Sequence, residues 1–146
     1  MPRYFRLSEA EAMLPHVEQA LRDALLHKSE YENAAQELER LNDRIRMAGG
    51  SRVNPSGFLA LRARRDTSAA ALKDAIERIQ STGAFLKDLN LGLVDFLARY
   101  HGEEVCLCWR LGESKIEYWH GMEEGFRGRK RIDEDFLQNH RGEKTN

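Results

Sequence analysis

The feature that most constrains this chain is a long stretch without helix breakers near its N-terminus. Between Glu9 and Gly49 the only glycine or proline is Pro15. A helix over 9–48 would be about 60 Å long, at about 1.5 Å per residue. Helices of this length usually belong to coiled coils or to long hairpins. The sequence therefore predicts a long helix over 9–48, with a kink or a break at Pro15.

Residues typical of helix ends divide this region into two helices. Ser8 is a predicted N-cap, and Glu11, three residues later, completes a capping box. The glycine pair at 49–50 predicts the end of the first helix, since glycine tolerates the left-handed backbone there. The Asn-Pro pair at 54–55 is typical of an N-cap and first helical residue, so we expect a second helix over 55–82.

Apolar residues recur three and four positions apart along the first helix, with two polar intrusions. This seam consists of Leu14, Val17, Leu21, Ala24, Lys28, Tyr31, Ala35, Leu38, Asn42 and Ile45. The pattern is that of a heptad repeat. Two helices alone bury little, so we expect a homodimer in which two hairpins form a four-helix bundle. The alternative is a single hairpin that is capped by a sheet.

After Gly83 the pattern changes to period two, which is typical of strands. We expect a meander over 84–120, with strands at 94–100, 104–111 and 115–120 and an edge strand at 84–88. Gly102 and Gly112 mark its turns. The predicted fold class is α+β: a long antiparallel helical hairpin with a small antiparallel sheet of three or four strands.

Tight turns would fix the register of this sheet. They would pair Ala98 with Leu107, and Leu107 with His120, on one largely apolar face. The opposite face would align Asp95, Arg110 and Glu117 in one row.

We expect a single domain over 1–131 that ends in a glycine- and arginine-rich loop at 121–131. For 132–146 we expect a polar, flexible tail with one amphipathic turn around Phe136 and Leu137.

Several motifs together resemble one protein family. They are Lys87-Asp88-Leu89, Gly92 to Phe96, Leu107 to Glu113, Ile116, Trp119-His120, Gly125 to Arg129, and the opening Phe5 to Pro15. Over about 3–131 the chain resembles the prokaryotic family called domain of unknown function 2203. The resemblance implies no activity, but it adds weight to Asp95, Arg110, Trp119, His120 and Arg129 as residues with a role.

The predicted row of Asp95, Arg110 and Glu117 has two interpretations. Opposite charges across strands stabilise a sheet by a few tenths to about 1 kcal/mol, so the row can be a structural ladder. It can also be a site for an anion or polar ligand, with Arg110 offering a bidentate fork and Trp119 a stacking surface. His120, next to a glycine-rich loop, could then act in acid–base chemistry or form a structural hydrogen bond.

Cys106 and Cys108 alternate with Leu107, so both thiols point to one face of a strand. Zinc sites need about four ligands, and His101, His120 and Glu123 are the candidates for additional ligands. The predicted register sends His120 to the other face, and the paired motifs typical of zinc sites, such as two C-x-x-C pairs, are absent from the sequence. We therefore expect two buried thiols, no metal site and no cofactor.

Charge and hydropathy narrow the functional classes. The net charge is −1, and the basic cluster over 127–131 is followed at once by acidic residues at 133–135, which does not favour nucleic-acid binding. No run of 18 apolar residues and no export signal are present, so we expect a cytoplasmic protein that does not enter membranes.

The sequence contains no recognisable catalytic set. We therefore favour a non-catalytic interaction or scaffold module that dimerises through its hairpin. The second interpretation is a small-molecule or anion-binding protein, with catalysis left open, that uses Asp95, Arg110, Glu117, Trp119 and His120. Nucleic-acid binding through 127–131 ranks third.

Overall fold

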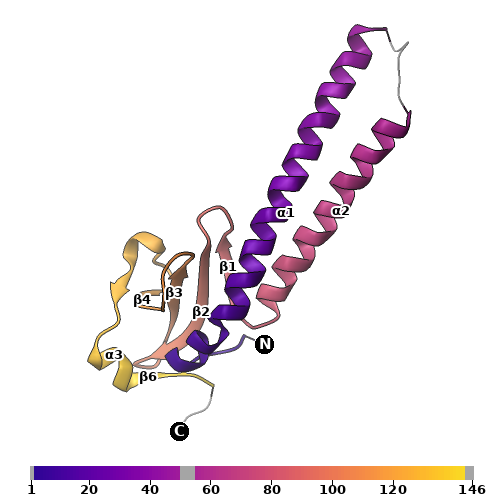
Figure 1. The fold of residues 1–146 in the computed structure, drawn as a ribbon. Coiled ribbons are helices and arrows are strands. Elements are labelled where there is room, and N and C mark those ends of the chain that lie inside the picture. Colours follow the sequence, from indigo (N-terminus) through magenta and orange to yellow (C-terminus); the bar gives the residue numbers. More distant parts are fainter. Residues whose placement is uncertain (1, 50–54, 144–146) are drawn as a thin grey trace. The chain divides into compact units, whose positions relative to one another are not determined.

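The computed structural model of the protein describes residues 2–49 and 55–143. Its first two elements are the long helices α1 (Leu7–Met47) and α2 (Pro55–Gln80), and a small antiparallel sheet follows them (Figure 1). The predicted α+β class, a helical hairpin with an antiparallel sheet, is confirmed. Gly50 and Asn54, which were expected to border the helices, lie outside the described residues.

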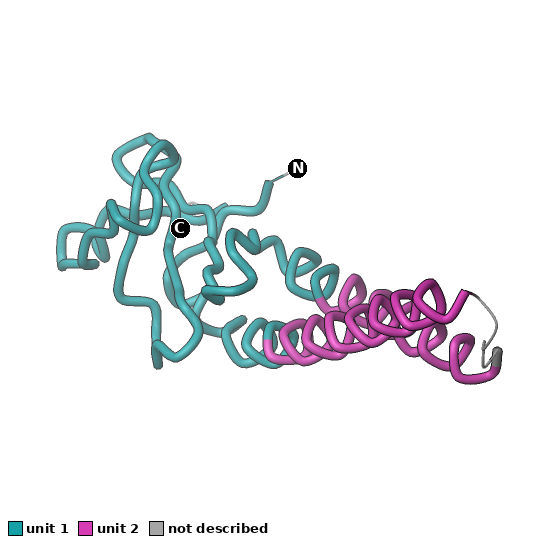
Figure 2. Tube along the Cα trace, turned by 90° about the horizontal axis from the view of Figure 1, so that it is seen from above, with its two compact units in different colours: residues 1–21, 76–146 teal, residues 22–75 magenta. Residues whose placement is uncertain are grey.

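The chain forms two compact units (Figure 2). The first comprises 1–21 and 76–146, and the second comprises 22–75. The second unit is a helical hairpin with a small interior. Its buried side chains among the described residues are Ala24, Ala34, Leu38, Ser68 and Ala75.

The start of α1 differs from the prediction. The Arg6 N–H donates to Glu9 Oε1 at 2.9 Å, and the Leu7 N–H donates to His140 Nε2 at 3.0 Å. Ser8 is therefore inside the helix, and its assignment as N-cap is wrong, because Glu9 and a histidine from the C-terminal region satisfy the first donors. The helix also continues through Pro15, so the predicted break is absent.

The sheet is antiparallel throughout. Its strands are β1 (Phe85–Asp88), β2 (Leu93–Tyr100), β3 (Glu103–Arg110), β4 (Tyr118–Gly121), β5 (Lys130–Arg131) and β6 (His140–Arg141). The first five lie side by side in sequence order, and β6 pairs with β2. One sheet face holds the core of this unit, where Phe5 and Phe96 meet edge to face with ring centroids 5.1 Å apart.

The hairpin of β2 and β3 is tighter than predicted. Ala98 pairs with Val105 rather than Leu107, because the turn consists of His101 and Gly102 alone. Both have positive φ, at 51° and 79°, as a two-residue type I′ turn requires. The register thus differs by two residues, which leaves every side chain on its predicted face.

The pairing of β3 with β4 differs by one residue, and this changes the faces. Leu107 pairs with Trp119, and Cys106 pairs with His120. The tight turn expected at Gly112 is wrong, because an irregular connection over 111–117 joins the two strands. The Trp109 indole N–H donates to the Glu113 carbonyl oxygen at 2.9 Å within that connection. As a result, His120 shares a face with Cys106.

The region after residue 131 is folded over 134–141, so the predicted polar tail is wrong there. Helix α3 (Glu134–Asn139) is capped by the Asp133 side chain, which accepts from the Phe136 N–H at 2.9 Å. Phe136 is fully buried and stacks on Trp119, with ring centroids 5.1 Å apart. An amphipathic turn was expected at this position, but its packing on the sheet was not.

No helix in the described part of the chain is long and apolar enough to cross a membrane.

The packing of Phe136 predicts a stability effect. We expect Phe136→Ala to lower the free energy of unfolding by about 3–5 kcal/mol, the usual cost of emptying a buried phenylalanine site. Urea unfolding followed by circular dichroism measures it. Leu137→Ala, at the exposed neighbouring position, is the matched control and should change little. Equal small effects of both variants would contradict the packing of α3.

Candidate functional site

Three neighbouring strands bring a carboxylate, a thiol and an imidazole together. Asp95 lies on β2, Cys106 on β3 and His120 on β4, on the sheet face opposite the Phe96 core. Potential ligand atoms of the three side chains all lie within 4.8 Å of one another. Each residue is at most 4% exposed. Buried polar groups of this kind need partners, so their convergence calls for a physical explanation.

His120 is held from both of its ring nitrogens. Nδ1 lies 2.8 Å from the Gly121 carbonyl oxygen, which can only accept, so this nitrogen carries a proton. Nε2 lies 3.2 Å from Oδ2 and 3.3 Å from Oδ1 of Asp95. Hydrogen bonds to Asp95 and Cys108 raise the pKa of His120 to about 10, although burial opposes them. In the absence of a metal ion, the pair is therefore an imidazolium and a carboxylate at neutral pH.

Both cysteines are buried and free of disulfides. Burial, followed by the charge of Asp95, raises the pKa of Cys106 to about 12, while the charge of Lys87 acts in the opposite direction. Cys106 is therefore a neutral thiol at physiological pH. Its sulfur lies 3.7 Å from the Met122 sulfur. A thiol in this state is a poor nucleophile, but it becomes a strong ligand once a metal ion displaces its proton.

A cavity of about 220 Å³ adjoins the cluster. Besides the three cluster residues, its lining includes Lys87, Leu93, Cys108, Met122, Glu124 and Phe126. The loop after β4 supplies Met122, Glu124 and Phe126. The motifs of the family resemblance include Lys87 and Phe126, but no sequence pattern predicted that they line a cavity beside His120. The position of the loop directly after the strand that carries His120 was the available clue.

The Glu124 side chain stabilises this loop through hydrogen bonds to its two ends. Its Oε1 accepts from the Gly121 N–H at 2.9 Å and from Lys130 Nζ at 2.6 Å. These contacts, Lys130 first, lower the pKa of Glu124. A Cβ atom at Gly128 would lie 2.8 Å from the Glu124 Cβ, so glycine at 128 permits the close approach.

The predicted row of Asp95, Arg110 and Glu117 does not form. Arg110 pairs with Leu93, and its guanidinium lies 5.6 Å from the centre of the Phe126 ring. Glu117 precedes β4 and lies 4.0 Å from Lys115 Nζ. The register differs from the prediction in both hairpins, and this separates the three side chains. The prediction of a charge ladder is therefore wrong.

Trp119 and Arg129 have structural contacts. Trp119 lies on the other face from His120, where it stacks on Phe136. Arg129 Nη2 donates to both carboxylate oxygens of Glu113 at 2.7 and 2.8 Å. Its guanidinium lies between the rings of Tyr118 and Phe126, 4.1 and 4.7 Å from their centres. Arg129 thus holds the wall of the cavity in place.

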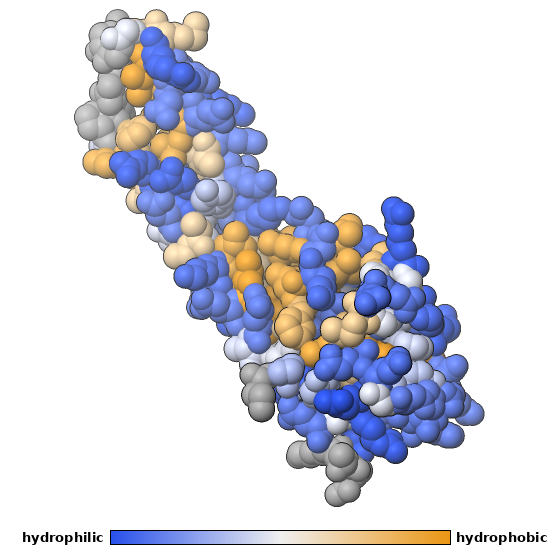
Figure 3. Space-filling model, turned by 180° about the vertical axis from the view of Figure 1, so that it is seen from behind, coloured by the Kyte–Doolittle hydropathy of each residue, from blue (hydrophilic) through white to orange (hydrophobic). Residues whose placement is uncertain are grey.

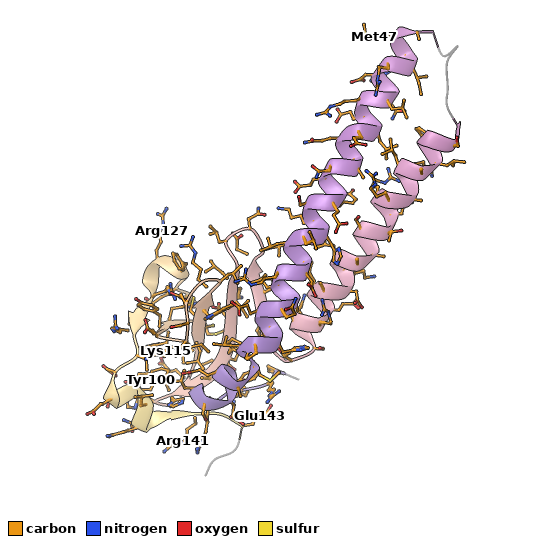
Figure 4. All side chains as sticks on the ribbon, viewed as in Figure 1. Met47, Tyr100, Lys115, Arg127, Arg141 and Glu143 are labelled. Carbon is orange, nitrogen blue, oxygen red and sulfur yellow. The ribbon has the colours of Figure 1, made fainter. Side chains whose placement is uncertain are left out.

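The other weak candidates fall outside the cluster. Glu123 is exposed and is not among the three grouped metal-ligating residues of the described chain. Within the basic segment 127–131, Lys130 pairs with Glu124, while Arg127 projects outward from the short 3-10 turn η1 (Phe126–Gly128) (Figure 4). The expectation of no metal site depended in part on His120 facing away, and the observed register places His120 on the same face as Cys106.

Comparison with known proteins identifies the family. The sequence model of an uncharacterised conserved protein family, DUF2203, matches residues 3–132. The chain belongs to the DUF2203 family. The match includes Asp95, Cys106 and His120 and extends almost to α3. None of the curated proteins and none of the solved structures matches the chain.

The raised pKa of His120 predicts a pH effect on the metal-free protein. The folded chain binds this proton more tightly than the unfolded chain, whose histidine has a pKa near 6.5. The stabilisation is complete below about pH 6.5 and is lost as the pH rises toward about 10. We expect the free energy of unfolding of wild type, relative to His120→Gln, to fall over this range.

Urea unfolding with a chelator present, at several pH values, measures this difference. His16→Gln, which changes an exposed histidine of α1, is the control and should follow wild type. A difference between wild type and His120→Gln that stays constant with pH would contradict the ion pair.

Proposed function

We propose that this protein binds a transition-metal ion, with Zn²⁺ as the first candidate, through Asp95, Cys106 and His120. The observation that carries the proposal is the convergence of three different donor groups from three strands within 4.8 Å in a buried place. Zinc accepts nitrogen, sulfur and carboxylate oxygen together. Calcium and magnesium prefer ligand sets made of oxygen alone.

The orientation of His120 supports this proposal. Histidine ligands usually donate their second ring N–H to a carbonyl or a carboxylate, which fixes the ring and its tautomer. The contact from Nδ1 to the Gly121 carbonyl has this form. It leaves Nε2 directed at Asp95 and at the cluster.

Charge balance gives a second line of support. Without metal, the Asp95 carboxylate is balanced by the His120 imidazolium, and Cys106 is neutral. A divalent ion would replace the His120 Nε2 proton and the Cys106 thiol proton, and would face two negative ligands. The site is then neutral in both states, which suits burial because uncompensated charge in the interior is costly. Binding of one ion releases two protons.

Metal affinity tests this function directly. We expect purified chain to bind one Zn²⁺, measured by competition with a chromophoric chelator and by elemental analysis. Asp95→Asn, Cys106→Ser and His120→Gln each remove a ligand. Each should weaken Zn²⁺ binding by more than about 10–100-fold, the usual loss when a residue that only hydrogen-bonds to a metal ligand is removed.

His16→Gln is the control for loss of an exposed histidine and should bind as wild type does. Calorimetry in buffers of different ionisation enthalpy should report about two protons released per ion. A wild-type chain that binds neither Zn²⁺ nor Co²⁺ would overturn the proposal.

A second function concerns the hairpin. We propose that two copies of the chain pair through unit 2 and that the protein serves as an interaction module. One leucine, Leu38, and four small residues are the buried side chains of its described part, which is little for so long a hairpin. Leu26 and Leu59 are 58% and 60% exposed. Apolar patches lie among hydrophilic residues along the hairpin in the view of Figure 3.

The charges of the hairpin suit a second copy as the partner. The α1 part, 22–47, has five basic and six acidic residues, whereas the α2 part, 55–75, has four basic and two acidic residues. The two helices therefore have opposite net charge. A twofold pair can place α1 of each copy against α2 of the other.

Light scattering tests the dimer. We expect wild type to have twice the mass of one chain, and Leu26→Glu with Leu59→Glu to have the mass of a monomer with unchanged helix content. Gln36→Glu with Thr67→Glu adds the same two charges at exposed polar positions and should stay dimeric. A wild type that is monomeric at micromolar concentration would contradict this function.

A further inference from the structure

We infer that the metal ion keeps one coordination position open to the adjoining cavity, and that this position takes a small monocarboxylate whose charge Lys87 balances. The inference rests on the proposed metal site. It goes beyond that site by assigning the chemical class of a ligand.

The number of available donors supports an open position. Asp95, Cys106 and His120 provide three ligand atoms that lie mutually close. Cys108, which also lines the cavity, is outside this group. Structural zinc sites have four protein ligands, whereas sites that bind substrates have three and leave one position to water or ligand.

The cavity lies where such a ligand would bind. All three cluster residues line it, so a ligand bound in the cavity would reach an ion held by these residues. Its volume of about 220 Å³ is below the about 300–1,000 Å³ of pockets for drug-sized molecules. The ligand is therefore small. Leu93, Met122 and Phe126 provide an apolar wall for its carbon atoms.

Charge selects an anion. Lys87 on β1 is the one lysine or arginine among the residues that line the cavity, and Lys130 already neutralises Glu124 at its rim. The metal site itself is neutral when loaded, so Lys87 leaves an excess positive charge. A monocarboxylate restores neutrality. One of its oxygens can bind the metal while the other accepts from the ammonium group.

Cobalt-substituted protein provides the test, because the visible spectrum of Co²⁺ reports its coordination. We expect acetate to shift the bands of the Co²⁺-loaded wild type with saturation, and acetamide, a neutral molecule of similar shape, to leave them unchanged. Lys87→Gln should weaken acetate binding about tenfold or more, since a charge-assisted contact is lost. Lys87→Arg should keep most of the affinity.

The outcomes separate this inference from the proposed function. Lys87 is not a ligand, so the acetate-free spectrum of Lys87→Gln should equal that of wild type. If wild type binds Co²⁺ but acetate leaves the spectrum unchanged, and Cys108→Ser weakens the thiolate absorption, then Cys108 fills the fourth position. That result overturns the open position and leaves the metal site intact. No Co²⁺ spectrum at all overturns both.

Discussion

The buried contact between His120 and Asp95 is the constraint on which this site depends. Two ionisable groups at most 4% exposed are costly to desolvate, and their attraction compensates only if the geometry is maintained. That geometry requires β2, β3 and β4 to pair in one register. It also requires Gly121, the next residue, to present its carbonyl to the second ring nitrogen. A shift of one residue would remove His120 from this face.

The loop that closes the site is held by interactions at its margins. Glu124 ties the loop to β4 and to Lys130, and Arg129 ties it to Glu113. Phe126 contacts the Arg129 guanidinium and lines the cavity. Arg129, which the family resemblance marks as a residue with a role, therefore acts by positioning the wall. The residues that touch the cluster and those that maintain its shape form one connected network.

Sequence patterns were sufficient for the hairpin and the first four strands, but insufficient for α3, β5 and β6 and for the register. The lack of helix-breaking residues after Pro15 predicted a long helix, because helix formation is local. The structure has this helix, and it ends at Met47. The face of β3 also followed from alternation alone. The place of His120 did not, since it depends on the connection over 111–117, whose conformation depends on tertiary contacts such as Trp109 with Glu113. For the same reason the pattern identified Asp95, Cys106 and His120 singly but did not group them.

A residue near the C-terminus accepts a hydrogen bond from one of the free N–H groups in the first turn of α1. The Leu7 N–H binds His140 across 133 positions of sequence, and β6 pairs with β2 beside it. During synthesis on the ribosome the hairpin can form from contacts within 22–75, whereas this bond has to wait until His140 has emerged. Closing so long a loop costs entropy that local contacts do not repay. Unit 1 is therefore expected to fold after the hairpin of unit 2 has formed.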